Sequence, residues 1–269
     1  MSSRQFRIAL IQMAVRPDDL EGNLNRARGK LADAASQGAS LALLPECFDL
    51  GWCSSAARSE AGLIPEGRSC QILMQSAREH RIYVCGGITE RSGDRICNAA
   101  VLISPNGELL LHHRKIHELD IAETIYSRGD RLGVIETEMG ILGLMICADG
   151  FADGLVLSKS LGQMGAQLIL SPCAWAVPND HNNESDPYGQ LWRDSYGPVC
   201  TEFGCSIIGV SNVGRIGGGE WKDRPCIGSS LAVGLDGEDI LQAPYGDDAE
   251  CILYVEWDGA SLRPIDPPA

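Results

Sequence analysis

The sequence predicts an α/β protein built from mixed β-sheets that lie in layers and are covered by helices. Apolar runs of strand length alternate with longer segments whose apolar residues recur every three or four positions, the spacing of one helix face. At least four pairs of predicted strands look antiparallel, because short turns connect them. No low-complexity linker and no shift in composition marks a boundary, so residues 1–269 are expected to form a single domain.

The first part of the chain alternates strands and helices and then changes to a hairpin. The first helix starts at Asp18-Asp19 and stops at Gly38, residue types typical of helix ends. The hairpin turn contains Asn106-Gly107, the strongest short hairpin signal when it lies between apolar runs. The predicted elements are, in order, strand 7–13, helix 18–38, strand 41–44, helix 69–81, strand 82–88 and the hairpin strands 100–104 and 108–112.

The second part continues the alternation and ends in a proline-rich tail, 263–269, of which 265–269 is expected to be an exposed arm. Gly197-Pro198 is expected to interrupt one helix, and the glycine-rich segment 214–219 is expected to be a mobile loop. The predicted elements are strands 132–136 and 141–147, helix 151–164, strand 167–170 ending at Pro172, helix 187–203, and strands 206–210, 231–233, 240–242 and 252–256.

The composition excludes several classes of protein. There are 36 acidic against 22 basic residues, a net charge of −14, which argues against nucleic acid because phosphate binding needs clustered Lys and Arg. No apolar run approaches the ~20 residues that span a bilayer. The N-terminus lacks the basic start and the small-residue cleavage site of a signal peptide. We therefore expect a cytoplasmic protein that binds neither nucleic acid nor a membrane.

Neither a metal site nor a cofactor is expected. No two of the eleven cysteines have Cys-x-x-Cys spacing, and a free cysteine by default behaves as a small buried hydrophobe. His113 and His117 are four residues apart, but they leave a strand, where this spacing does not place both on one helix face. The segment 214–219 has the spacing of neither a dinucleotide fingerprint nor a P-loop.

Cys147 differs from the other cysteines in its position. It ends an apolar strand and is followed by Ala148-Asp149-Gly150 and a helical stretch. The carboxyl end of a strand is where α/β folds place their sites, and a helix N-terminus favours the thiolate. Another core cysteine would be followed by apolar residues rather than by a tight polar turn.

Two charged residues follow strands in the same manner. Glu46 comes after the buried strand 41–44 and Pro45, and Lys115 follows the second strand of the hairpin. Either residue alone is better explained as a solvated strand end. Together with Cys147, however, they supply the base, the oxyanion stabiliser and the nucleophile of acyl transfer.

Three segments resemble the signature segments of the nitrilase superfamily of carbon–nitrogen hydrolases. They are Leu-Leu-Pro-Glu46, His-Arg-Lys115-Ile-His and Met-Ile-Cys147-Ala-Asp. The resemblance extends over nearly the whole chain, because the segments that start at Asn98, Gly165, Val210 and Gly228 also match. It implies an αββα sandwich, a homodimer or higher homo-oligomer, and a small-molecule amide-like substrate that reacts with water without a cofactor or metal.

The resemblance also assigns roles to residues. It makes Glu46 the general base, Lys115 the oxyanion stabiliser and Cys147 the nucleophile, with the backbone N–H of Ala148 as a second oxyanion donor. A supporting glutamate follows the Lys in this family, and Glu123 is the best match, with Glu118 as the runner-up. The expected pocket-wall residues are Trp175, Trp52, Tyr126 and Asn179; for Trp175 a core aromatic is an equal alternative.

Departures from the family pattern narrow the expected substrate. Asp149 keeps the usual acid, but the arginine expected four residues after the cysteine is replaced by Phe151. Cys-Ala-Asp instead of Cys-Trp-Glu argues against a nitrile, and Cys-x-Asp-Gly is similar to the aliphatic amidases. We expect hydrolysis of a small linear amide through a cysteine thioester. The alternatives are an N-carbamoyl-amine hydrolase or nitrilase, then an acyltransferase, then a catalytically inactive interaction protein.

Overall fold

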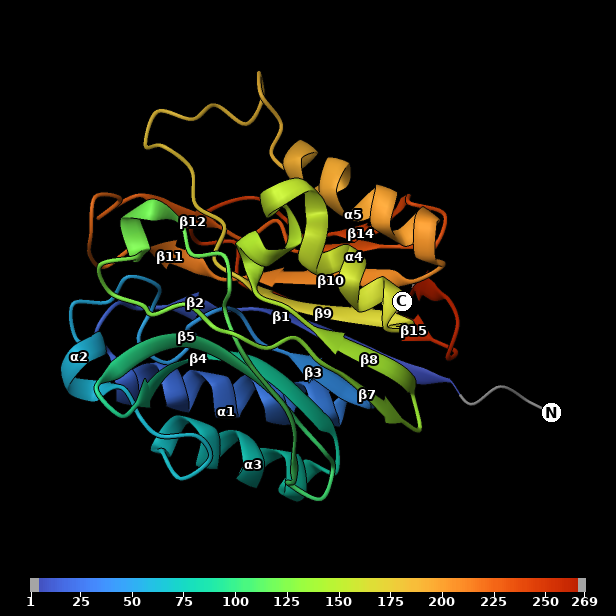
Figure 1. Cartoon of the computed structure of the whole chain (residues 1–269), viewed down its shortest axis with the longest axis horizontal. Helices are drawn as coiled ribbons and strands as arrows, with labels where there is room; N and C mark the ends of the chain where they lie inside the picture. The colour runs from blue at the N-terminus through green and yellow to red at the C-terminus, as the bar shows by residue number, and fades with distance from the viewer. Residues whose placement is uncertain (1–4, 266–269) are drawn as a thin grey trace.

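The computed structural model describes residues 5–265, and these form a four-layer sandwich. Figure 1 shows two sheets between two pairs of helices. One pair, α1 (Leu20–Ser36) and α3 (Arg68–His80), lies below the first sheet, and the other, α4 (Val156–Gln163) and α5 (Gln190–Phe203), lies above the second. The predicted αββα architecture is therefore confirmed.

The first sheet has the order β16-β15-β1-β3-β4-β5-β6. Its centre, β1, β3 and β4, is parallel, and its flanks pair antiparallel, so it is a mixed sheet as predicted. The strands are β1 (Phe6–Gln12), β3 (Leu41–Leu43), β4 (Tyr83–Ser92), β5 (Arg95–Ile103), β6 (Leu109–Arg114), β15 (Cys251–Trp257) and β16 (Leu262–Pro264).

The second sheet has the order β14-β13-β10-β9-β8-β7, with β8, β9 and β10 parallel. A small third sheet, β12-β11-β2, lies at one end of the sandwich. The strands of these sheets are β2 (Ala14–Val15), β7 (Val134–Thr137), β8 (Gly140–Leu144), β9 (Leu168–Cys173), β10 (Ser206–Ser211), β11 (Val213–Arg215), β12 (Pro225–Ile227), β13 (Leu231–Val233) and β14 (Asp239–Gln242).

Two hydrophobic cores hold the layers together, and β1 contributes to both. Ile8 and Leu10 face the second sheet, whereas Ala9 and Ile11 face α1 and α3. Successive side chains of a strand point to opposite faces, so a strand buried on both sides becomes continuously apolar. This explains why the strand 7–13 lacks alternation. The sandwich fixes the ends of β3, β6 and β8, which carry the candidate site.

The helix expected over 151–164 begins later than predicted. Residues 152–155 form a short 3-10 turn, η3 (Ala152–Leu155), in which Asp153, Gly154 and Leu155 have φ of 48°, 69° and 68°. A left-handed backbone cannot belong to a right-handed helix, so α4 begins only at Val156. Tight 3-10 turns, and not the first turns of an α-helix, therefore follow Cys147 directly.

Gly197-Pro198 does not interrupt its helix. Helix α5 runs continuously from Gln190 to Phe203, and it starts three residues later than expected because Gly189 has φ of 126°. Gly197 passes close to Gly237: a Cβ atom added to Gly197 would lie 3.1 Å from the carbonyl oxygen of Gly237. Packing against the β13–β14 hairpin thus offsets the hydrogen bond that Pro198 cannot make.

Three smaller differences concern prolines and loops. β9 continues past Pro172 to Cys173. Its neighbour β8 ends at Leu144, which pairs with Leu170, so no residue of β8 lies opposite Pro172. The missing N–H of the proline therefore breaks no hydrogen bond to β8. Part of the glycine-rich segment 214–219 belongs to β11. In the predicted tail, 263 and 264 belong to β16, while residues 266–269 of the expected arm lie outside the described residues.

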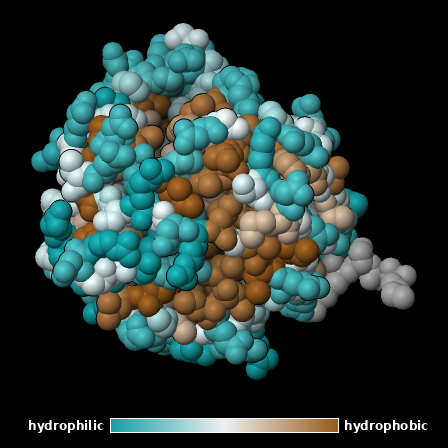
Figure 2. Space-filling view, viewed as in Figure 1, coloured by the Kyte–Doolittle hydropathy of each residue, from teal (hydrophilic) through white to brown (hydrophobic). Residues whose placement is uncertain are grey.

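Figure 2 shows an apolar band across the face viewed in Figure 1, over the region of α4, β7 and β8. Val156, the first residue of α4, is 46% exposed. Partly buried apolar residues that pack against the core between the sheets include, from β6, from β7 and the loop before it, and from the turns before α4, Leu110, Leu111, Leu132, Val134, Ile135, Phe151 and Leu155.

Candidate active site

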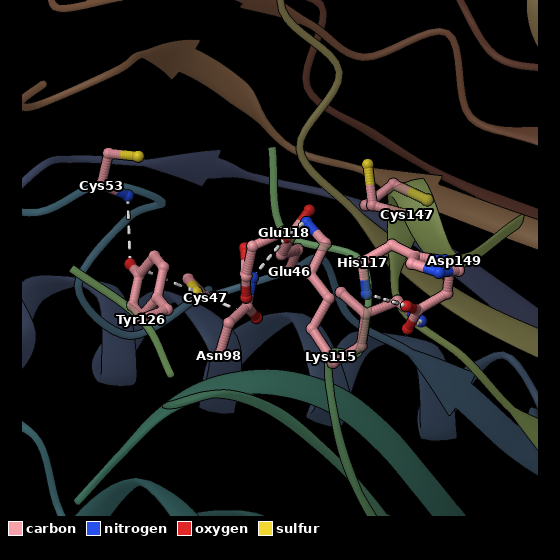
Figure 3. A network of polar contacts seen from close by, with 12 residues as sticks. Glu46, Cys47, Cys53, Asn98, Lys115, His117, Glu118, Tyr126, Cys147 and Asp149 are labelled. Atoms are coloured by element: carbon pink, nitrogen blue, oxygen red, sulfur yellow. Dashed lines mark hydrogen bonds and ion pairs between the residues drawn. The ribbon is translucent and has the colours of Figure 1, made fainter. Parts of the chain in front are cut away.

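The structure brings Glu46, Lys115 and Cys147 together between the two sheets. Glu46 and Lys115 follow β3 and β6 of the first sheet, and Cys147 follows β8 of the second. Lys115 Nζ lies 2.6 Å from Glu46 Oε1, and Cys147 lies close enough to interact electrostatically with both charges. Figure 3 shows these side chains in one network of polar contacts.

Glu46 is held rigidly from three sides. Its backbone N–H donates to the carbonyl of Cys173 at 3.1 Å, and Asn98 Nδ2 donates to its Oε1 at 2.6 Å. Gly87 of β4 passes so close that a Cβ atom there would lie 2.6 Å from the Glu46 Cα. The loop that follows β3 can therefore pack against β4 only because residue 87 is glycine. With 1% exposure, Glu46 is almost completely removed from solvent.

Lys115 is an ammonium group buried among two carboxylates and an aromatic ring. Its Nζ lies 3.8 Å from Glu118 Oε2 and 5.6 Å from the centre of the Trp52 ring. Burial disfavours the charged form, but the nearby charges of Glu46 and Glu118 outweigh it and raise the pKa of Lys115 well above its ordinary value. The lysine therefore stays charged and can stabilise a negative oxygen.

Cys147 occupies a strained turn and carries a neutral thiol. It begins the 3-10 turn η2 (Cys147–Gly150) with φ of 45°, and its N–H donates to Ser171 Oγ at 3.2 Å. A hydrogen bond with the Cys173 thiol, burial and the charge of Glu46 together raise the pKa of Cys147 well above its ordinary value. A thiol in this state needs a base before it can act as a nucleophile.

Asp149 connects the turn at Cys147 with the loop after Lys115. Its Oδ1 accepts the N–H groups of Ile116 and His117, and its Oδ2 accepts the N–H of Ile146. Burial opposes its charge, but the hydrogen bond from His113 and the charge of that ring lower the pKa of Asp149. It is therefore an ionised carboxylate with no solvent exposure.

The structure places Glu118, and not Glu123, beside Lys115. Glu123, the expected residue, is exposed just after η1 (Asp120–Ala122), whereas the runner-up Glu118 is buried beside Lys115. The turn of η1 directs residue 123 outward, a feature of loop conformation that the spacing from Lys115 does not reveal. Burial raises the pKa of Glu118 to about 8, with Lys115 opposing and Glu46 adding to the shift.

Of the expected pocket residues, Trp52 lies at the reacting groups and Trp175 lies in the core between the sheets. Trp52 is 5% exposed and lies beside the Lys115 ammonium. Trp175 is 2% exposed and stacks on Trp192 at 4.5 Å, with Tyr188 at 6.0 Å. Trp175 is therefore mainly a core aromatic, which is the alternative that the sequence left open for it. Its indole N–H, like that of Trp52, has no hydrogen-bond partner among residues 5–265.

The structure does not bring the other two pocket candidates to the reacting groups. Tyr126 lies behind Cys47, where its hydroxyl accepts the Cys53 N–H at 3.0 Å, so it supports the loop after Glu46 (Figure 3). Asn179 is exposed and lies 3.4 Å from Arg215 Nη1 on the surface. The sequence located both in the right segments but could not show which way they face.

Sequence reasoning missed Asn98 and His113 as parts of the site. Asn98 is fully buried in β5 and is a polar residue within an apolar strand, which is a usable signal because such a group must find a partner. His113 was considered only as a metal ligand. Within residues 5–265, no group of three or more His, Cys, Asp or Glu side chains is arranged to hold a metal ion.

Comparison with known proteins identifies the family. The carbon–nitrogen hydrolase family model matches residues 7–266. Omega-amidase NIT2 of Xenopus tropicalis is 37% identical over 183 residues, which cover 64% of this chain and 64% of that protein. A nitrilase of Pyrococcus abyssi is 33% identical over 178 residues, covering 64% and 66%. These matches thus span slightly less than two thirds of each relative.

Solved structures show the same fold. An amidase from Nesterenkonia sp. superposes with a TM-score of 0.80 and 22% identity, covering 95% of this chain and 91% of that one. A carbon–nitrogen hydrolase from Helicobacter pylori G27 gives 0.79 and 22%, covering 94% and 89%. The family match over nearly the whole length, together with the shared sandwich, confirms the predicted resemblance: this chain belongs to the carbon–nitrogen hydrolase family.

Proposed function

We propose that this protein is a cofactor-independent thiol hydrolase that cleaves the C–N bond of a small linear amide. The observation that carries the proposal is the buried Glu46–Lys115 pair, with 2.6 Å between Nζ and Oε1, beside a neutral Cys147 thiol at the end of β8. These groups supply the base, the oxyanion stabiliser and the nucleophile of an acyl transfer. The names of the omega-amidase relatives and of the amidase structures agree with this reaction class.

In the first half of the reaction, Glu46 takes the proton from Cys147 and the sulfur attacks the amide carbonyl carbon. The carbonyl oxygen becomes an oxyanion, which the Lys115 ammonium and the backbone N–H of Ala148 stabilise. One such donor is typically worth roughly 3–4 kcal/mol. The proton on Glu46 then passes to the amide nitrogen, the C–N bond breaks, and ammonia leaves a thioester on Cys147.

In the second half, water replaces ammonia. Glu46, again ionised, takes a proton from the water as its oxygen attacks the thioester carbonyl, and the same two donors stabilise the second oxyanion. The C–S bond then breaks, and the proton returns from Glu46 to the sulfur. One amide and one water yield one carboxylic acid and one ammonia, and the enzyme regains its starting state.

Glu118, and not Glu123, is proposed as the supporting carboxylate. Neither of its oxygens makes a hydrogen bond to a described residue, although the side chain is buried. With a pKa of about 8, it is largely protonated at neutral pH before a substrate binds. A neutral carboxyl group can both accept an N–H of the substrate amide and donate its own O–H, so it can hold the leaving nitrogen beside Lys115.

The charges of the site favour a neutral substrate. Lys115, the ammonium of the site, is already paired with Glu46, and the His113 ring is paired with Asp149. A carboxylate on the substrate would therefore find no unpaired cation among the described residues of the site, at a cost in binding. The Trp52 ring provides an apolar wall suited to a short alkyl chain.

Ammonia release from a panel of substrates tests the proposal. We expect a neutral amide such as butyramide to be hydrolysed at least ~10-fold more efficiently, in kcat/KM, than the half-amide of a dicarboxylic acid, an N-carbamoyl amine or a nitrile. Cys147→Ala protein is the control and should release no ammonia. Ammonia release by that variant would overturn the proposal, and acyl transfer to an added amine in preference to water would identify an acyltransferase.

We also propose that residues 1–269 act as one domain within a homo-oligomer in the cytoplasm. The eleven cysteines are all unpaired, and ten of them are buried. The apolar band in Figure 2 offers a surface for a second copy. No helix within residues 5–265 is long and apolar enough to cross a membrane. Light scattering of the purified protein measures the oligomeric state, and a monomeric mass would contradict this part of the proposal.

A further inference from the structure

The turn that carries Cys147 lacks the arginine that the family pattern leads one to expect. That position is Phe151, which packs edge-on against Trp192 at 5.4 Å and brings no charge to the turn. Asp149 nevertheless stays ionised with its side chain fully buried. A buried carboxylate needs a partner of opposite charge, because its desolvation is otherwise too costly. Another residue must therefore supply the positive charge that Asp149 needs.

The partner of Asp149 is His113, at the end of β6. His113 Nε2 lies 2.7 Å from Asp149 Oδ2, and His113 Nδ1 lies 3.1 Å from the carbonyl oxygen of Arg131. A carboxylate and a carbonyl oxygen can only accept hydrogen bonds. Both contacts are therefore hydrogen bonds only if both ring nitrogens carry protons, which makes the ring an imidazolium. The His113 side chain is 3% exposed, so water does not replace either partner.

The other charged groups around His113 are already engaged. The neighbouring His112 and Arg114 both bind Glu90, at 3.0 Å and 2.6 Å, on the other face of the strand. Lys115 is paired with Glu46. His117, which follows in the loop, pairs through its ring with Asp153 at 3.0 Å. Asp149 is thus the one carboxylate that faces His113 among the described groups.

Asp149 in turn joins the two segments that carry the reacting groups. Its Oδ1 accepts the N–H groups of Ile116 at 3.0 Å and His117 at 2.8 Å, directly after Lys115. Its Oδ2 accepts the N–H of Ile146 at 3.0 Å, directly before Cys147. A single carboxylate therefore fixes the spacing between the loop of the first sheet and the turn of the second.

We propose that the His113 imidazolium takes the place of the missing arginine and is a positioning residue for the reaction. It holds Asp149 ionised, and the ionised carboxylate holds Lys115 and Cys147 at the spacing that the oxyanion and the nucleophile require. The inference rests on the proposed function above. A misplacement of about 1 Å at reacting groups can lower the rate by about 100-fold, so the contribution is kinetic as well as structural.

The kinetic test compares His113→Asn with the matched control His112→Asn, from the adjacent position of the same strand. His113→Asn removes the positive charge from Asp149 and should lower kcat by about 10- to 100-fold while KM changes less than about 3-fold. His112→Asn should keep kcat within about 3-fold of the wild type. Asp149→Asn should lower kcat as His113→Asn does, and the double variant should be no slower than the slower single variant, because residues that act as one unit are not additive.

The protonation state is tested directly by 15N NMR of the histidine rings in the otherwise unmodified protein. We expect His113 to show protons on both ring nitrogens at pH 7, and Asp149→Asn to abolish this state; a ring with a single proton in the wild type would overturn the inference. The NMR result also decides the matter if His113→Asn fails to fold. If Cys147→Ala is inactive while folded His113→Asn has wild-type kcat, this inference fails and the proposed function stands; if Cys147→Ala retains turnover, the proposed function itself fails.

Discussion

Two buried carboxylates near the loop after β3 have opposite surroundings. Asp49 accepts hydrogen bonds from Ser69 Oγ at 2.8 Å, from the Leu50 N–H at 2.9 Å and from both the N–H and the hydroxyl of Thr89. Glu118 makes no hydrogen bond to a described residue. Burial raises both pKa values, to about 6 for Asp49, where the hydrogen bonds oppose the shift, and to about 8 for Glu118.

The difference separates a group that stabilises the fold from one that is available to a substrate. Both oxygens of Asp49 accept hydrogen bonds from the protein. These hydrogen bonds stabilise the fold by holding the loop against α3 and β4. The oxygens of Glu118 are removed from water and accept no hydrogen bond from a described residue, and the Lys115 ammonium 3.8 Å away compensates only in part, which is costly before a substrate binds. Such a cost is tolerable where a substrate completes the hydrogen bonds. Changes in the Asp49 region should therefore affect stability, and changes in the site should affect turnover.

The largest expected effect is on turnover and concerns Cys147. Cys147→Ser should lower kcat by at least ~10⁴-fold, because an alcohol is a far weaker nucleophile than a thiol that can be ionised by Glu46. The free energy of unfolding should change by less than about 1 kcal/mol, since the substitution is nearly isosteric. Initial-rate kinetics and denaturant unfolding measure the two quantities. Comparable turnover by the variant would remove Cys147 from the mechanism.

The next largest effect is on stability and concerns Asp49. Asp49→Ala leaves four donor contacts from Ser69, Leu50 and Thr89 without an acceptor, and each unsatisfied buried group costs about 1–3 kcal/mol. We expect the free energy of unfolding to fall by at least about 4 kcal/mol in urea titrations, the lower end for four unsatisfied donors. The kcat of the molecules that remain folded should stay within about 3-fold of wild type. A large fall in kcat at unchanged stability would erase the distinction between the two regions.

The site residues differed in how well the sequence could place them. Glu46, Lys115 and Cys147 each follow a strand whose apolar run is visible in the sequence, so their convergence at strand ends was predictable. Glu118 and Glu123 belong to a loop, where the 3-10 turn η1 alone decides which carboxylate points inward. Spacing along the chain does not determine such a direction.

The fold shows the same limit. The strands and the main helices follow from local periodicity, and the layered α/β class follows from their order. The predictions that failed depend on contacts made in the folded state. Helix α5 continues through Pro198 because Gly197 packs against Gly237, and α4 begins late because residues 153–155 are left-handed. Neither contact nor dihedral is encoded in a short window of sequence.

The pH dependence of stability distinguishes the two carboxylates. A carboxyl group whose pKa is higher in the folded than in the unfolded state binds more protons when folded, so stability falls as pH rises between the two values. For Asp49 this window runs from 3.8 to about 6, and for Glu118 from 4.5 to about 8. Between pH 6 and pH 8 most of the fall that these two groups cause comes from Glu118, about 2 kcal/mol.

Glu118→Gln should therefore reduce the fall in unfolding free energy between pH 6 and pH 8, whereas Asp49→Asn should leave it nearly unchanged. A Glu118→Ala variant should lower kcat/KM by about 10- to 100-fold, because it removes both the acceptor and the donor that hold the substrate amide, two groups that the Gln side chain keeps. Urea titrations at pH 6 and pH 8 with all three proteins measure the slope. An identical slope in wild type and Glu118→Gln would show that the buried carboxyl group does not carry the raised pKa.

The smallest expected effect concerns β4, the strand that serves both regions through neighbouring residues. Thr89 binds Asp49, and Gly87 lets β4 approach the Glu46 backbone, where a Cβ atom would lie 2.6 Å from the Glu46 Cα. The matched control is Gly86→Ala, whose Cβ would meet only side-chain atoms, the nearest 3.2 Å away in Leu44. The two variants add the same methyl group to adjacent residues, on opposite faces of one strand.

Gly87→Ala must move the backbone of Glu46 away from Lys115, so we expect kcat to fall by about 10-fold and the free energy of unfolding to fall by about 1–3 kcal/mol. Gly86→Ala should cost a similar amount of stability but leave kcat within about 2-fold of wild type, because it presses on the apolar layer under α1 and α3. The ratio of the two kcat values is the informative quantity, since overpacking is common to both variants. Equal kcat values would mean that the position of Glu46 is not set by its contact with β4.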